Sequence, residues 1–203
     1  MHVAHVITRL IIGGAQQNTL LTCEDQHRDF DDEVTLITGP ALGPEGSLIE
    51  RAQAAGFRVI VLDSMRRSIH PWRDWRSYRE LLAVLRDLKP DIVHTHSSKA
   101  GILGRAAAWK ERVPAVVHTI HGLAFHPFQG RLKNALYIAS ERYAARRCHK
   151  IIGVADAMRD QALAVGIGRP EQYVTVYSGM EVEPYLEPQW SRADVRAELG
   201  LHE

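Results

Sequence analysis

Short runs of β-branched and apolar residues alternate along this chain with longer segments of helical periodicity. The predicted strands are residues 2–7, 34–37, 58–62, 92–95, 115–119, 150–154 and 174–177. Each run is short, rich in Val and Ile, and mostly apolar without alternation, which is typical of strands that are covered on both faces. The pattern therefore predicts an α/β fold with a doubly wound, Rossmann-like, mostly parallel sheet of six to seven strands.

The segments between the strands have the apolar spacing of helices. The predicted helices are residues 15–27, 47–55, 73–88, 100–110, 132–143, 155–165 and 191–199. Pro90 and Gly166 provide stop signals for two of them. Four residues on one face of the 132–143 helix predict a buried stripe. They are Leu132, Leu136, Ala139 and Tyr143.

The end of the chain differs in character from the rest. We expect one Rossmann-like domain over residues 1–182. Residues 183–203, with Pro184 and Pro188, are expected to form a linker that leads toward a missing second domain. Ser191 is a candidate N-cap for the last helix, with Asp194 three residues later. No strand follows that helix, which favours a truncation within a linker.

Composition narrows the class of protein. Twenty-five Lys and Arg residues against 24 Asp and Glu residues leave a formal charge of +1, which disfavours a nucleic-acid binder. Two cysteines in 203 residues suggest a reducing cytoplasm and no disulfide framework. We expect neither a signal peptide nor a spanning helix, since no apolar run approaches about 18 residues.

The loop after the first strand contains adjacent glycines, Gly13 and Gly14, before a helix. Glycines allow the backbone to approach a ligand closely, and a helix start carries partial positive charge. The spacing is not G-x-G-x-x-G, which disfavours a nicotinamide or flavin cofactor but not a phosphate. A turn without any ligand remains the alternative.

Histidines follow two further strands. His94 and His96 share one strand face, and Ser97 or Ser98 can cap the next helix. A metal at His-x-His needs a third ligand, and no other cluster supplies one, so no metal site is predicted. The segment 118–126 carries further histidines, including His121. Ligands bind beyond the carboxyl ends of parallel strands, so we expect one shared cleft rather than separate loop histidines.

These segments resemble a known family. The Gly13–Gln16 loop, the stretches 90–109 and 117–122, and residues 174–185 occur in the order found in the N-terminal half of GT-B glycosyltransferases, family 4. The resemblance covers nearly all of residues 1–200. It implies an acceptor-side domain of a retaining enzyme that moves a sugar from a nucleotide-sugar to a glycan or lipid-linked acceptor, usually without a metal or other cofactor. Such enzymes serve polysaccharide and glycolipid biosynthesis.

The resemblance also implies roles for individual residues. His121 matches the histidine at the reaction centre, and Gly13 and Gly14 would approach the diphosphate of a UDP- or GDP-sugar. The implied substrate-side residues are Gln16, His96, Ser97, Lys99 and Gly122. Met180 and Glu181 replace the family's usual Ile-Asp, which leaves a donor contact by Glu181 open. The family's paired glutamates and basic donor-binding residues lie in its C-terminal domain, so this chain alone is not expected to turn over.

Two other functions are compatible with the same residues. One is a UDP-sugar 2-epimerase of the GT-B fold, and the other is a solitary domain that binds a glycan or partner without catalysis.

Arginine and aromatic residues gather in two places. The first is the segment 66–76, where Trp75 also lies on a helical stripe with Tyr78 and could belong to the core. The second is a basic set of Arg131, Lys133 and Arg142. Either suits peripheral association with an anionic membrane, at its cytoplasmic inner face. Solvated basic faces are the alternative, and Arg146 and Arg147 could complement a helix C-terminus.

Overall fold

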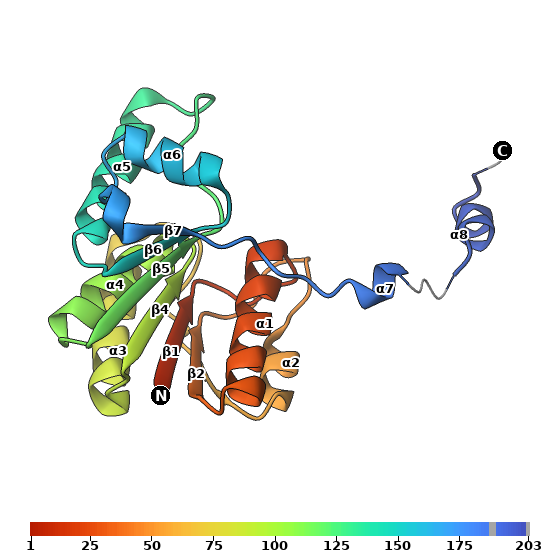
Figure 1. Cartoon of the computed structure of the whole chain (residues 1–203), viewed down its shortest axis with the longest axis horizontal. Coiled ribbons are helices and arrows are strands. Elements are labelled where there is room, and N and C mark those ends of the chain that lie inside the picture. The colour runs from red at the N-terminus through yellow and green to blue at the C-terminus, as the bar shows by residue number, and fades with distance from the viewer. Residues whose placement is uncertain (187–189, 202–203) are drawn as a thin grey trace.

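The computed structural model describes residues 1–186 and 190–201, and its centre is a parallel β-sheet (Figure 1). Within the described residues the sheet has seven strands in the order β3-β2-β1-β4-β5-β6-β7, and every neighbouring pair is parallel. The strands are β1 (His2–Ile7), β2 (Glu33–Thr38), β3 (Arg58–Val61), β4 (Ile92–His96), β5 (Ala115–Ile120), β6 (Lys150–Gly153) and β7 (Tyr173–Thr175). The predicted doubly wound α/β fold is confirmed.

Helices cover both faces of the sheet. They are α1 (Gly14–Asp29), α2 (Ile49–Ala54), α3 (Pro71–Leu88), α4 (Ser98–Lys110), α5 (Arg131–Ala145), α6 (Asp156–Ala164), α7 (Glu183–Leu186) and α8 (Arg192–Glu198). On one face, Leu20 and Cys23 of α1 pack with Leu36 of β2. On the other, Leu81 and Leu85 of α3 pack with Val93 of β4. Burial of these two apolar layers stabilises the sheet from both sides.

The strand order reverses between β1 and β4. From β1 the chain proceeds to β2 and β3 on one side, and it then returns to β4 on the other side of β1. The two connections leave this point in opposite directions, so the carboxyl ends of β1 and β4 border a crevice. Open α/β sheets bind their ligands at such a position.

Glycines let α4 lie close to the sheet. A Cβ at Gly101 would lie 2.5 Å from Cε1 of His118, and a Cβ at Gly104 would lie 2.7 Å from Cγ2 of Thr95. Both distances are too short for carbon atoms that do not share a bond. The glycines of the 98–110 segment therefore reflect helix packing rather than ligand binding.

The predicted buried stripe on α5 is wrong. Leu132 and Leu136 are 86% and 61% exposed, and Ala139 and Tyr143 are also exposed. The helix instead buries Glu141, Ala144 and Ala145 near its C-terminal end. Periodicity identified an apolar row on α5 correctly. The helix packs its opposite side against the domain, because the small side chains of Ala144 and Ala145 allow a close approach there.

A buried ion pair joins α5 to α4. Nη2 of Arg105, a fully buried residue, lies 2.6 Å from Oε2 of Glu141, and its Nε donates to the carbonyl of Gly101. We expect Arg105→Met to lower the free energy of unfolding by about 3–5 kcal/mol, because it leaves a carboxylate buried without its partner. Urea unfolding measures this change. Arg105→Met/Glu141→Leu should recover most of the loss, and a double variant as unstable as the single one would contradict the argument.

Trp75 lies outside the core, so the interpretation of Trp75 as a core residue is wrong. Its side chain is half exposed and stacks on Trp72, with ring centroids 5.1 Å apart. Pro71 begins α3 and His70 is its N-cap, so Trp75 falls in the first turns of the helix. The same stripe reaches the core further along, where Tyr78 packs against it and Leu81 and Leu85 are buried in it.

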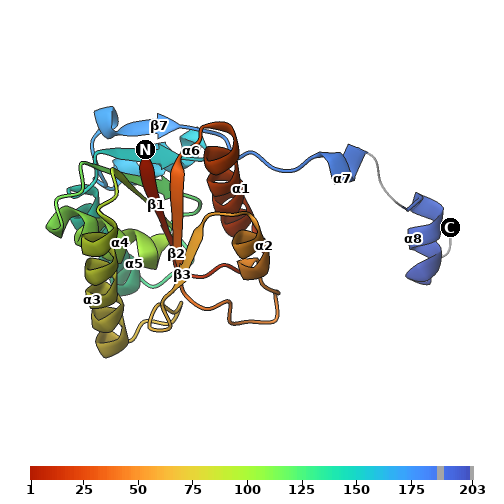
Figure 2. The same ribbon diagram turned by 90° about the horizontal axis from the view of Figure 1, so that it is seen from below.

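The last described residues extend away from the sheet, beyond α1 and α2 (Figures 1 and 2). In α8, Ser191 Oγ accepts a hydrogen bond from the backbone N–H of Asp194, which confirms the predicted cap. Part of the expected linker forms the short helix α7, and the predicted role of Pro188 lies outside the described residues. Across residues 1–186 and 190–201, none of the helices has the length and apolar character needed to cross a membrane.

Candidate functional site

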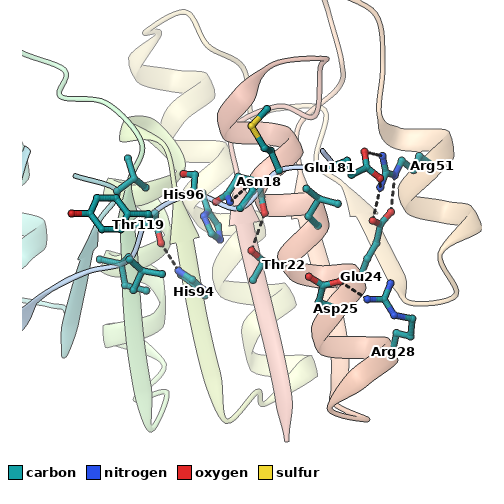
Figure 3. Close-up of a pocket in the computed structure, with 18 of the residues that line it drawn as sticks. Asn18, Thr22, Glu24, Asp25, Arg28, Arg51, His94, His96, Thr119 and Glu181 are labelled. Atoms are coloured by element: carbon teal, nitrogen blue, oxygen red, sulfur yellow. Dashed lines mark hydrogen bonds and ion pairs between the residues drawn. The ribbon is translucent and has the colours of Figure 1, made fainter. Parts of the chain in front are cut away.

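Two adjoining cavities lie between α1, the sheet and the segment that follows β7. The first has a volume of about 640 Å³, and His94, His96 and Thr119 line it (Figure 3). The second has a volume of about 550 Å³, and Gly14 and His121 line it. The two share lining residues, which are Asn18, Leu21, Val154, Ser178, Gly179, Met180 and Glu181. They therefore form one continuous cleft.

The glycine loop ends at the second cavity. Gly13 is the N-cap of α1 and offers no side-chain cap, while a Cβ at Gly14 would meet nothing within 4 Å. The first N–H groups of α1 are therefore not satisfied by a cap, as suits an anion. Gln16 lies in the same first turn but lines neither cavity. Gly122 is exposed directly after His121.

A hydrogen-bonded row of side chains runs from α1 to the second cavity. His5 Nε2 donates to Oε1 of Gln26 at 2.7 Å, and His5 Nδ1 lies 3.1 Å from Nε2 of His96. His96 Nδ1 in turn lies 3.1 Å from Nε2 of His121. Sheet register explains the arrangement, because His5 pairs with His94 across β1 and β4 and His96 projects on the same side two residues later. We call Gln26, His5, His96 and His121 the histidine row.

Burial holds these imidazoles neutral. It lowers the pKa of both His5 and His121 to about 4, and it lowers the pKa of His96 well below its ordinary value. Burial acts in the same direction on the pKa of His94, whose Nε2 lies 2.7 Å from Oγ1 of Thr119. A neutral imidazole has one donor nitrogen and one acceptor nitrogen, as a hydrogen-bonded row requires.

His5, His94 and His96 also have the composition of a metal site, with one nitrogen from each within 4.8 Å of the others. Sequence reasoning missed His5 as the third member. Both nitrogens of His5 and both of His96 already face hydrogen-bond partners. A metal would have to break this row, so the geometry favours hydrogen bonding.

The helix cap at the end of β4 differs from the prediction. Ser97 occupies the N-cap position of α4 without capping it, and its Oγ lies 2.8 Å from Oγ1 of Thr8. Thr8 Oγ1 instead accepts from the backbone N–H of Ala100. Ser97 has a φ of 61°, a strained conformation for a residue other than glycine. Its hydroxyl thus joins the ends of β1 and β4.

Lys99 faces α3 rather than the histidine row. Its Nζ lies 2.6 Å from Oδ1 of Asp74 and donates to the carbonyl of Ser68. The ammonium group is therefore already bound within the protein.

The segment 176–181 forms the outer wall of the cleft and is held by two contacts with α1 and α2. Asn18 Nδ2 donates to the carbonyl of Gly179 at 3.3 Å. Arg51 binds both Glu24 and Glu181, at 2.7 and 2.9 Å (Figure 3). Hydrogen bonding to Arg51 lowers the pKa of Glu181. The carboxylate of Glu181 is thus occupied by the protein.

Comparison with known proteins identifies the family. The family described as glycosyl transferase 4-like domain matches residues 13–179. The chain belongs to this family. A relative from Escherichia coli, named UDP-Gal:alpha-D-GlcNAc-diphosphoundecaprenol alpha-1,3-galactosyltransferase, is 30% identical over 201 residues. That match covers 98% of this chain and 50% of the relative, so the chain spans half of the relative's length.

Solved structures share the fold of this glycosyl transferase 4-like chain. A glycosyltransferase from Rickettsia africae has a TM-score of 0.67 at 13% identity, covering all of this chain and 50% of that one. A putative UDP-N-acetylglucosamine 2-epimerase from Listeria monocytogenes also has a TM-score of 0.67, at 14% identity over 98% of this chain and 51% of that one. Fold similarity alone therefore does not separate the two activities.

Proposed function

We propose that this chain is the acceptor-side half of a retaining glycosyltransferase that moves a sugar from a nucleotide-sugar to a lipid-linked or glycan acceptor. The observation that carries the proposal is the relative that matches 98% of the chain, whose name specifies a UDP-sugar donor and a diphosphoundecaprenol-linked acceptor. The cleft supports this function, because Gly14 and His121 line the same cavity from opposite sides of the sheet's switch point.

The groups that line the cleft or lie beside it have different roles toward the donor and the acceptor. The uncapped start of α1 attracts the donor diphosphate through backbone N–H groups and the helix dipole. His121 is neutral and contacts a hydroxyl of the transferred sugar. Ser97 and Lys99 act on the acceptor side by holding the loop after β4. Glycosyl transfer also requires charge stabilisation around an oxocarbenium-like transition state, which we assign to the remaining half of the full-length protein.

The decisive experiment incubates the full-length protein with UDP- and GDP-sugars, including UDP-galactose, and a GlcNAc-diphospholipid acceptor. We expect a product that forms only when the acceptor is present and that keeps the anomeric configuration of the donor. Absence of transfer and of donor hydrolysis with every donor would refute the proposal.

A UDP-sugar 2-epimerase is the second candidate, because an epimerase shares the fold equally well. An epimerase changes the donor without any acceptor, so donor conversion in acceptor-free buffer distinguishes the two enzymes. A solitary binding domain would bind a glycan and convert no donor at all.

We expect Gly14→Val to weaken donor binding at least about tenfold, because the new side chain would enter the cavity that Gly14 lines. Stability should change by less than about 0.5 kcal/mol, since nothing lies within 4 Å of the added Cβ. Donor titration of the full-length protein measures the effect. Gly130→Val is the control, because Gly130, the N-cap of α5, is likewise a glycine at a helix start with open space around it. Equal donor affinity in the two variants would remove Gly14 from the site.

We further propose that α5 binds the inner, cytoplasmic face of an anionic membrane that carries the acceptor. Phe128 and Leu132 are 95% and 86% exposed, and the exposed cations Arg131 and Lys133 lie beside them. An exposed apolar row flanked by cations matches the chemistry of an anionic lipid surface. Arg142 and Arg147 are used within the protein, since both donate to backbone carbonyls.

Flotation with phosphatidylglycerol-containing vesicles tests this proposal. We expect Leu132→Glu/Leu136→Glu to reduce the bound fraction at least about fivefold at low salt, because it adds two anions to the lipid-facing row. Phe30→Glu is the control, because Phe30 is an exposed apolar residue at the end of α1. Wild-type protein that fails to float at low salt would contradict the proposal.

A further inference from the structure

The histidine row contains a group that fixes the direction of all its hydrogen bonds. Gln26 Oε1 has lone pairs and no hydrogen, so it can only accept from Nε2 of His5, 2.7 Å away. Because His5 is neutral, its Nδ1 then carries no hydrogen and must accept. The group that faces this nitrogen at 3.1 Å is Nε2 of His96, which must therefore donate.

The same reasoning continues to the cavity. His96 has its hydrogen on Nε2, so its Nδ1 accepts, and the nitrogen that faces it at 3.1 Å is Nε2 of His121. His121 consequently has its hydrogen on Nε2 and a free lone pair on Nδ1. A single amide oxygen on α1 thus decides the tautomer of three imidazoles in succession.

We propose that Gln26, His5 and His96 are positioning residues that hold His121 in its Nε2–H tautomer, with Nδ1 available to accept a hydrogen bond from a substrate hydroxyl. The hydrogen bond from a substrate hydroxyl rests on the proposed function, whereas the tautomer of His121 does not. The reverse tautomer would present a donor to the cavity and would compete for hydroxyl lone pairs instead.

Burial keeps the inner imidazoles of the row, His5 and His96, from taking up a second proton. A second proton on His5 or His96 would bring two N–H groups face to face at about 3 Å, where neither has an acceptor. His5 and His96 are fully buried, so water cannot relieve such a mismatch. Ring contacts support the geometry further, since His96 stacks on both His5 and His121, with centroids 5.3 and 5.4 Å apart.

The first test is nuclear magnetic resonance of the chain with ¹⁵N-labelled histidine, in the absence of any substrate. We expect His121 to carry its proton on Nε2, with a ¹⁵N–¹⁵N coupling across the hydrogen bond to Nδ1 of His96. A proton on Nδ1 of His121, or no coupling to His96, would overturn the proposal.

The second test changes the hydrogen-bonding group at position 26, which begins the row. Gln26→Lys replaces the acceptor by a donor, so we expect the proton of His121 to move to Nδ1. Gln26→Glu retains an acceptor at the same place and should retain the wild-type tautomer. Gln26→Leu removes the acceptor without supplying a donor and should give two tautomers of His121. Gln53→Lys is the matched control, because Gln53 is exposed on α2. An unchanged His121 spectrum in both Gln26→Lys and Gln26→Leu would refute the role of Gln26.

Activity separates this inference from the proposed function. In the full-length protein, we expect Gln26→Lys to lower turnover about 10-fold and Gln26→Glu to leave it within about 3-fold, as for one misdirected hydrogen bond. If the tautomers are as expected but the wild-type protein transfers no sugar, the proposed function is wrong, and the positioning role of Gln26, His5 and His96 is still supported. If transfer occurs but His121 carries its proton on Nδ1, the row fails alone.

Discussion

Replacing His121 by alanine in the full-length protein is expected to lower turnover by about 10²–10³-fold, the usual effect of removing one polar group preorganised at a reaction centre. His121 lies at the carboxyl end of β5, lines the cavity that Gly14 also lines, and is held by His96. Steady-state kinetics with saturating donor and acceptor would measure the change. The proposed contact to the transferred sugar predicts an effect mainly on kcat, as for an interaction that stabilises the transition state more than the ground state.

A matched variant distinguishes this role from a general effect of losing a histidine. His126 lies five residues later and is exposed, so His126→Ala should retain nearly full activity. His121→Asn keeps a donor for His96 and an acceptor for the substrate, and should recover part of the loss. If His121→Ala were as active as His126→Ala, His121 would have no catalytic role.

Acidification from pH 7 to pH 5 is expected to remove about 2–4 kcal/mol of folding stability through His5 and His121 alone. Burial lowers the pKa of each from 6.5 to about 4, so between these values the unfolded chain binds protons that the folded chain does not. The stability is thus fully present above about pH 6.5 and is lost as the pH falls toward 4. His94, His96 and His118 have pKa values lowered in the same direction and add to the effect.

Urea unfolding at pH 7, 6 and 5 would measure this loss. His121→Ala removes one of the titrating groups and should reduce the slope of stability against pH by up to about 1.4 kcal/mol per unit. Stability that stays constant down to pH 5 would show that these imidazoles are not held neutral by the fold.

The sequence predicts the fold well because its determinants are local. Mostly apolar runs without alternation, such as Val34–Ile37, identify strands covered on both faces, and Pro90 and Gly166 mark where helices stop. The error at α5 has a different origin. Leu132 and Leu136 form a regular apolar row, yet periodicity cannot tell a row that faces the core from one that faces outward.

The candidate site shows the same limit. Gly14, His96 and His121 lie at or just beyond the carboxyl ends of β1, β4 and β5, and strand order brings them together as parallel sheets require. His5 and Gln26 escaped notice because their role depends on the register of β1 against β4 and on the side of α1 that faces the sheet. A histidine inside an otherwise apolar strand was the available signal for His5. Nothing in the sequence near Gln26 indicates its partner.

The wall of the cleft differs mechanically from its floor. The floor is a hydrogen-bonded sheet. The segment 176–181 makes a backbone hydrogen bond at its start, from Val176 N–H to the carbonyl of Gly153, and is then held by one amide contact from Asn18 and an ion pair between Arg51 and Glu181, side chains that are 38% and 50% exposed. Such contacts contribute about 1–2 kcal/mol together, and the ionic part weakens as salt screens it. We therefore expect the wall to be displaced at a lower free-energy cost than the histidines beneath it, which the sheet holds in place. A substrate would enter past a weakly held wall and would contact side chains that the sheet keeps fixed.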